Sequence, residues 1–479
     1  MKSMKKNAVL TIFRTLLSLL IPLITFPYIT RILSVEEIGG FNFSTSIISY
    51  LVLIAGLGIN TYAIREGAKI RENKARIDQF ASEMYTINIF STLFAYVVLI
   101  FLLITINKFN YYKSIILILS LTVFLNCFSR QWIFNVYEDF EVITYLQMAF
   151  QILSVILTLV CIRHSGDVNK YALIYVLSTS GPYLIYGFIS KKYVKINFKN
   201  VSLSDLKKHI KPIMIIFGMA IATTVYINSD ITILGFLAND YTVGIYSTAV
   251  KIYNIVKQVL VAVITVTIPR LTAYAGTEKF KSLFTKVFDA LIVMTIPAMV
   301  GLYMLSKNVV LIIAGNHYLQ AVSSLRILCF AIVCALIANL FGTCVLLPYG
   351  KELIFLIATV ISALVNIILN FILIPFFGEN AAAFTTALSQ FIVLVIHYYY
   401  SKKYIDISKS IKCIILCIIG SGLIITAYLV VKSFHLALYI ETIVVIFISV
   451  LLYGISQIIL GNDIVIDLIK STLSKIKNK

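Results

Sequence analysis

The chain has 479 residues, of which 60% are hydrophobic and only 13% are charged. A soluble domain carries about 25% charged residues, so this composition excludes a water-soluble globular protein. The excess of Lys and Arg (40) over Asp and Glu (21) does not indicate nucleic-acid binding, because the positive residues fall in the connections between apolar runs. We therefore expect an all-α, polytopic membrane protein.

The apolar runs predict about fourteen membrane-spanning helices, because about 20 apolar residues are needed to cross a bilayer as a helix. Barrel strands would instead give alternating segments of about ten residues. The expected spans are 8–33, 42–64, 83–106, 114–135, 142–162, 170–190, 212–237, 244–268, 286–306, 323–347, 353–376, 381–400, 410–431 and 436–460.

Lys and Arg concentrate in alternate connections, among them the N-terminus, 65–82, 191–211 and the C-terminal tail. Connections that face the cytoplasm carry most of the positive charge in membrane proteins. We therefore expect both termini to be cytoplasmic and the number of spans to be even.

A weak internal repeat divides the chain. Gly39, Phe41 and Arg65 correspond to Gly244, Tyr246 and Arg270. The predicted organisation is an N-lobe of six spans (1–190), a basic cytoplasmic linker (191–211), a C-lobe of six spans (212–400), and two further spans with a tail (401–479). With an even number of spans in each half, the repeat is parallel, and transporters built in this way bind substrate between the halves.

A polar face runs along the first span through Thr11, Arg14, Ser18, Pro22 and Thr25. Because charge inside a membrane usually faces protein or water, we interpret this face as a cavity wall. The alternative is that Arg14 snorkels to the nearby interface. Arg31, at the outer end of the same span, is expected to snorkel, or to contact Asp230 in the seventh span. Asp230 at that depth would seek a cation or accept a proton; the alternative is that it simply lies at the membrane interface.

The eighth span carries Lys251, Asn254 and Gln258 on one face, with Lys257 beside it. Lys257 lies near the middle of the apolar run, too far from either interface to snorkel easily. Ammonium groups pair with phosphate as compact point charges. Lys251 and Lys257 together with Arg14 would form a cationic lumen suited to a pyrophosphate.

Other polar groups give weaker signals. The end of the fourth span carries Arg130, Gln131 and Asn135, followed by Glu138 and Asp139, and we interpret it as a solvated helix end. The sequence shows no P-loop, no nucleophile elbow and no metal-ligand cluster. We expect neither catalytic residues nor a metal, and no enzyme activity.

The chain resembles the bacterial polysaccharide repeat-unit flippases of the Wzx type, which belong to the multidrug/oligosaccharidyl-lipid/polysaccharide exporter superfamily. The stretches that carry the resemblance are 14–33, 35–41, Gly58-Ile59-Asn60, 63–66, 230–235 and 243–247. It implies two six-helix lobes related by a pseudo-two-fold axis around a central cationic cavity, with two additional C-terminal helices. It also implies a place in the bacterial cytoplasmic (inner) membrane.

The resemblance further implies a flippase that moves oligosaccharide repeat units, linked to undecaprenyl pyrophosphate, across that membrane by alternating access. The product would be O-antigen of lipopolysaccharide, capsule or another polymer, with a polysaccharide polymerase and a chain-length regulator as partners. Arg14, Lys251 and Lys257 match essential cations of the family, whereas the second span lacks its mid-span cation. The family also implies coupling to an H+ or Na+ gradient, with Asp230 as the candidate and no other cofactor.

Two alternatives remain open. A multidrug or cation antiporter of the same superfamily should have an acidic cavity, whereas the deep charges here are mainly positive. A polysaccharide polymerase should carry a large outer loop, which this sequence does not show.

Overall fold

The computed structural model describes residues 4–467 and residue 470. The chain divides into two compact units, Met1–Gly244 (unit 1) and Ile245–Lys479 (unit 2). The described residues of both units form α-helices joined by short turns and 3-10 or π-helical segments, and they contain no strand. The expected all-α class is therefore confirmed. The predicted lobe and linker boundaries remain a prediction.

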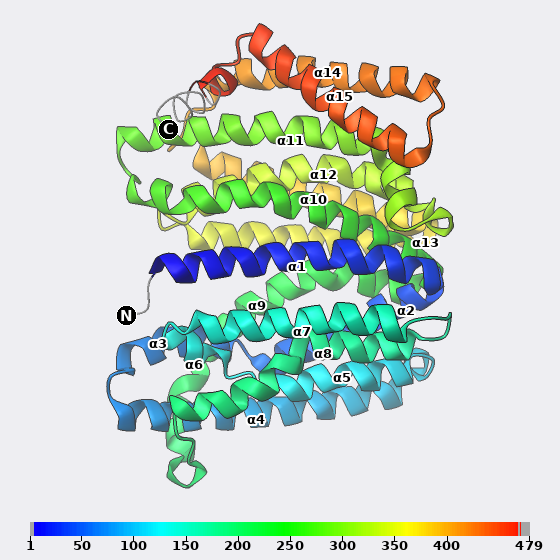
Figure 1. The fold of residues 1–479 in the computed structure, drawn as a ribbon. Coiled ribbons are helices and arrows are strands. Elements are labelled where there is room, and N and C mark those ends of the chain that lie inside the picture. Colours follow the sequence, from blue (N-terminus) through cyan, green and yellow to red (C-terminus); the bar gives the residue numbers. More distant parts are fainter. Residues whose placement is uncertain (1–3, 468–469, 471–479) are drawn as a thin grey trace. The chain divides into compact units, whose positions relative to one another are not determined.

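Unit 1 is a bundle in which long helices lie alongside one another, with shorter helices among them (Figure 1). They are α1 (Met4–Ile32), α2 (Val35–Gly56), α3 (Ile59–Ile70), α4 (Lys74–Thr105), α5 (Lys113–Asn126), α6 (Gln131–Val136), α7 (Phe140–Cys161), α8 (Val168–Ile189) and α9 (Leu203–Leu237). The most central is α2, which packs against α4, α5 and α9, while α1 packs against α7.

Unit 2 begins within α10 (Asp240–Ala273), whose first turn still belongs to unit 1. Its other helices are α11 (Glu278–Ile313), α12 (Ala321–Phe341), α13 (Glu352–Ser401), α14 (Ile411–Ser433) and α15 (Leu438–Ile459). α12 packs on α13, and α11 packs on α12, α14 and α15. Gly378 breaks α13 with φ 54° and ψ −130°, so this element consists of two helices joined at a kink.

Every predicted span overlaps a helix, or one of the two halves of α13. By length and composition, 11 helices among the described residues could cross a membrane, so the predicted count of fourteen is not confirmed. Two expected spans are interrupted. The second is broken at Leu57 and Gly58, both at positive φ, and the fourth ends at Asn126, before Arg130 at φ 33°.

The start of α2 is fixed by local hydrogen bonds. The Ser34 hydroxyl accepts the Glu37 N–H at 3.1 Å and the Glu37 carboxylate accepts the Ser34 N–H at 2.8 Å. This reciprocal capping box satisfies amide groups that the first turn of a helix leaves without partners. Glu37 also accepts the Gly166 N–H at 2.6 Å and thereby ties α2 to the α7–α8 connection.

Asp167 orders that connection. Its carboxylate accepts the N–H groups of Arg163 (2.9 Å) and His164 (3.1 Å) and pairs with Lys170 at 2.7 Å. The backbone hydrogen bond from Arg163, followed by the Lys170 ammonium, holds the pKa of this carboxyl well below its usual range.

Helices α2 and α10 begin at corresponding residues of the repeat and cross at its glycines. A Cβ on Gly39 would lie 1.8 Å from the carbonyl oxygen of Asp240, and a Cβ on Gly244 would lie 2.2 Å from that of Val35. The Tyr112 hydroxyl donates to Asp240 at the same crossing. Burial, and then this hydrogen bond, raise the pKa of Tyr112 above its ordinary value. The backbones can approach this closely because both positions lack a side chain.

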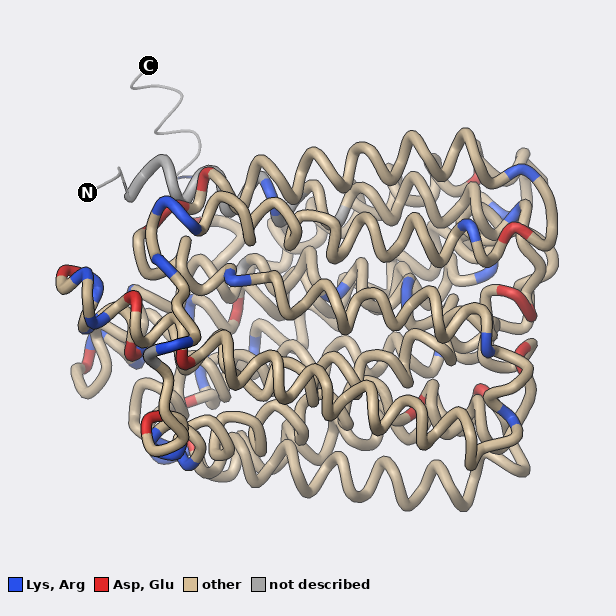
Figure 2. Tube along the Cα trace, turned by 90° about the horizontal axis from the view of Figure 1, so that it is seen from below, with Lys and Arg blue, Asp and Glu red and all other residues tan. Residues whose placement is uncertain are grey.

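Charged residues gather toward the helix ends, and long central stretches carry almost none (Figure 2). This distribution is expected of helices in a bilayer, where a charge near the centre costs several kcal/mol (about 2.5–3.5 on insertion scales). The few cations in the helix interiors therefore need a separate explanation.

Candidate functional site

The predicted polar face of the eighth span lies on α10. Lys251, Asn254 and Lys257 are half-buried there, and Gln258 is exposed. The opposite side of α10 is buried and carries Ala249, Ile252 and Leu260. The Lys257 ammonium lies 4.6 Å from the centre of the Tyr253 ring, a cation–π contact that holds this cation within the helix interior. The face therefore exists, while its role in binding remains a prediction.

Arg14 is half-buried on α1. One turn further on, the Ser18 hydroxyl donates to the Arg14 carbonyl at 3.0 Å. Gln151 of α7 donates to the Ser18 hydroxyl at 3.3 Å, while its own amide oxygen is buried and has no partner among the described residues. Of the polar face predicted on the first span, Ser18 therefore contacts α7, while the Thr11 side chain lies outside the described residues. The interpretation of this face as the wall of a cavity remains a prediction.

Arg31 and Asp230 have different environments. Arg31 is exposed at the end of α1, where its guanidinium donates to the Pro27 carbonyl. Asp230 is buried in α9. Two residues further on, the Thr232 hydroxyl shares a hydrogen bond of 3.2 Å with the Tyr50 hydroxyl of α2. The proposed Arg31–Asp230 contact and the ion-coupling role of Asp230 remain predictions.

A cavity of about 410 Å³ lies inside unit 1, among α2, α5, α8 and α9. Its lining combines hydroxyl and amide groups with four aliphatic side chains, and it includes no charged residue. The polar side chains include Thr45, Ser49, Asn126, Tyr175, Tyr183 and Asn228. Small-ligand pockets measure about 300–1,000 Å³. The sequence interpretation missed this cavity, and the only signal for it is the recurrence of neutral polar residues one turn apart within apolar spans.

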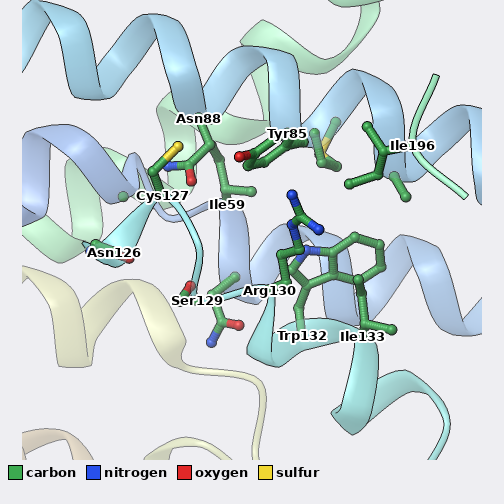
Figure 3. Close-up of a pocket in the computed structure, with 14 residues that line it drawn as sticks. Ile59, Tyr85, Asn88, Asn126, Cys127, Ser129, Arg130, Trp132, Ile133 and Ile196 are labelled. Atoms are coloured by element: carbon green, nitrogen blue, oxygen red, sulfur yellow. The ribbon is translucent and has the colours of Figure 1, made fainter. Parts of the chain in front are cut away.

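A smaller cavity of about 50 Å³ adjoins Asn126 and contains Arg130 (Figure 3). The guanidinium lies 4.1 Å from the centre of the Tyr85 ring and donates to the Gly187 carbonyl at 3.2 Å. Arg130 is half-buried, and its backbone has φ 33°, a conformation that is uncommon for a residue with a side chain. Arg130 thus lies at a helix boundary, as expected, but its guanidinium packs against Tyr85 instead of pointing freely into solvent.

A cluster of buried ionisable side chains joins α3, α4 and α9, and it was not predicted. His209 is bonded on one ring nitrogen to the Tyr62 hydroxyl and on the other to the Glu83 carboxylate, both at 2.7 Å. Lys208 pairs with the same carboxylate at 3.1 Å, and Gln79 donates to it at 3.0 Å. Glu83 is 2% exposed, so these contacts compensate a charge removed from water.

Known proteins resemble this chain in sequence and fold. The family model described as "Polysaccharide biosynthesis protein" matches residues 4–275. A protein of Escherichia coli (strain K12) named "Putative O-antigen transporter" is 24% identical over 384 residues, which cover 78% of this chain and 91% of the relative.

Among solved structures, "Lipid II flippase MurJ, inward closed conformation" has a TM-score of 0.75 at 18% identity, covering 96% of this chain and 99% of that one. An inward-facing multidrug resistance MATE family transporter has a TM-score of 0.63 at 15% identity, covering 81% and 94%. The same fold thus serves a lipid flippase and a drug transporter, so the fold does not decide between these functions.

Proposed function

Because the chain belongs to the polysaccharide biosynthesis protein family, we propose that it is a flippase for oligosaccharides linked to undecaprenyl pyrophosphate. It moves them from the inner to the outer leaflet of the bacterial cytoplasmic membrane by alternating access. The names of its Escherichia coli relative and of MurJ, an O-antigen transporter and a lipid II flippase, support this substrate class. Both termini face the cytoplasm, and a polymerase and a chain-length regulator act on the product.

The observation that carries the proposal is the pair of half-buried lysines, Lys251 and Lys257, in the interior of α10. A cation inside a membrane span is costly and generally marks a substrate or ion pathway. Such cations attract an anionic cargo, and a pyrophosphate is the anionic group of a lipid-linked oligosaccharide. A cavity that takes cationic drugs would need the opposite charge.

In the proposed mechanism, Lys251, Lys257 and Arg14 bind the pyrophosphate. Asn254 and Gln258 add hydrogen bonds beside the lysines. Arg31 lies about 25 Å from Arg14 along α1, so it meets the pyrophosphate at the outer end of the path. Asp230 takes up a proton or Na+ and thereby couples transport to the ion gradient, since a buried carboxylate changes its interactions when it is neutralised.

Gene deletion with complementation tests this proposal. Deleting the gene should cause lipid-linked oligosaccharides to accumulate in the cytoplasmic leaflet, and the wild-type gene should remove them. Lys257→Ala and Arg14→Ala should each lower the clearance rate about tenfold or more, because a hydrogen bond to a charged group contributes about 1.5–3 kcal/mol. The conservative Lys257→Arg should retain most of the activity.

Lys279→Ala is a matched control, because this lysine is exposed in the first turn of α11. Full clearance by both Lys257→Ala and Arg14→Ala would overturn the cationic site. Normal leaflet exchange with loss of polymer would instead favour the polymerase, and export of cationic dyes without clearance would favour the drug transporter.

A further inference from the structure

We propose that the hydroxyl- and amide-lined cavity of unit 1 binds an uncharged sugar residue of the transported glycan, an inference that rests on the proposed function. The cavity of about 410 Å³ is formed by α2, α5, α8 and α9. Its size falls within the range of about 300–1,000 Å³ typical of small-ligand sites. It lies apart in the sequence from the cations of α10.

The lining excludes charged ligands by its composition. It carries no Lys, Arg, Asp or Glu, and an anion such as a pyrophosphate is normally held by charged donors. A cationic ligand would need a carboxylate here. An acyl or prenyl chain would leave the Asn126 amide and the Tyr175 and Tyr183 hydroxyls without partners, which costs about 1–3 kcal/mol for each buried group. A neutral polyalcohol matches the lining on all these counts.

The cavity offers spare hydrogen-bonding capacity of both kinds. No hydrogen bond joins the Asn126 amide, the Tyr175 hydroxyl or the Tyr183 hydroxyl to another described residue. By contrast, the Thr45 hydroxyl donates to the Phe41 carbonyl at 2.8 Å and leaves its oxygen as an acceptor. A sugar hydroxyl both donates and accepts, so it needs partners of each kind.

Aromatic packing restricts the two tyrosines before any ligand enters. The Tyr175 ring meets Phe41 edge-on at 5.3 Å, and the Tyr183 ring lies 6.1 Å from Tyr186. Tyr186 is itself anchored, because its hydroxyl donates to the Ile143 carbonyl at 3.1 Å. Rigid, amphipathic side chains such as these lose little conformational freedom on binding. They present an apolar ring and a polar tip to the cavity, as a sugar ring requires.

The test measures equilibrium binding by purified full-length protein to two probes. One is the undecaprenyl-pyrophosphate-linked oligosaccharide extracted from cells that lack the gene, and the other is undecaprenyl pyrophosphate alone. The wild type should bind the glycosylated probe at least about tenfold more tightly. Asn126→Leu and the double variant Tyr175→Phe/Tyr183→Phe should each reduce this preference about tenfold and leave binding of the bare probe unchanged.

Tyr96→Phe is the matched control, because it removes a hydroxyl of the same unit that lies outside the cavity and donates to the Ser120 carbonyl. The tyrosine variants remove groups that make no hydrogen bond to the protein, so they keep the test decisive if Asn126→Leu folds poorly. An unchanged preference in all cavity variants, or an equal loss with both probes, overturns the sugar site.

The same variants separate this inference from the transport proposal. If the wild type moves neither probe between leaflets yet prefers the glycosylated one through Asn126 and the tyrosines, transport fails and the sugar site stands. If transport proceeds normally in the cavity variants with the preference intact, the sugar site fails and the flippase stands.

Discussion

The crossing of α2 and α10 at Gly39 and Gly244 makes a sharp prediction about stability. Replacing either glycine by Ala places a Cβ 1.8 Å or 2.2 Å from a backbone carbonyl oxygen of the other helix. A contact this short cannot be relieved by rotating a side chain, since the obstructing atom belongs to the helix backbone. One helix must move away, which loosens the packing around the crossing.

The expected cost follows from two opposing effects. Overpacking typically destabilises by about 1–3 kcal/mol, occasionally more. The higher helix propensity of Ala returns up to about 1 kcal/mol. We therefore expect Gly39→Ala and Gly244→Ala each to lower the free energy of unfolding by about 2 kcal/mol. For a cooperative unit the size of unit 1, this lowers the unfolding midpoint by roughly 4–8 °C.

Thermal unfolding of the purified protein, followed by tryptophan fluorescence, measures this loss. The chain contains a single tryptophan, Trp132, which is buried in unit 1 and therefore reports on the unit that contains the crossing. Gly218→Ala on α9 is the matched control, because it lies in the same unit and nothing lies within 4 Å of its added Cβ. The double variant Gly39→Ala/Gly244→Ala should lose less stability than the two single variants lose together, since moving the helices apart once relieves both contacts.

Unfolding of Gly39→Ala and Gly244→Ala at the same temperature as Gly218→Ala would contradict this prediction. It is also refuted if the two losses add fully, because the positions would then act independently rather than at one crossing.

Two further predictions concern polar groups of unit 1. Glu83→Ala should destabilise by about 3 kcal/mol or more, because it leaves His209 without its carboxylate, whereas Glu83→Gln should cost less; the Trp132 unfolding signal measures both. Asp167→Asn should weaken the acid dependence of stability. The folded-state pKa of Asp167 is lowered, so its stabilisation is complete above about pH 4 and is lost as the pH falls through that lowered pKa. A pH series of unfolding midpoints should be flatter in the variant, and an unchanged slope would contradict the account.

The helices were predictable because apolar runs of span length occur throughout the chain. The correspondence of Gly39 with Gly244 was also visible in the sequence, and in the structure each glycine meets the start of the other's helix. Interruptions within apolar runs were not predictable. Leu57 and Arg130 break their helices at positive φ, although neither residue type normally signals such a break.

The polar cavity and the ionisable cluster depend on packing between distant segments. Thr45 and Ser49 are one turn apart on α2, as are Tyr175 and Thr179 on α8. A hydroxyl in an apolar helix ordinarily bonds to its own backbone, so one such pair carries little information. His209 and Glu83 likewise lie far apart in the sequence and meet only when α9 packs beside α4.

The most direct test of the central claim is a leaflet-exchange assay with the purified chain. The protein is reconstituted into liposomes that contain a fluorescently labelled, undecaprenyl-pyrophosphate-linked oligosaccharide, and an added quencher reports the fraction in the outer leaflet. The account predicts that liposomes with the wild-type chain expose label from both leaflets, while protein-free liposomes expose only the outer one. The assay is run with an H+ gradient and with a Na+ gradient across the liposome membrane. Equal quenching with and without the protein under both gradients would contradict the flippase proposal.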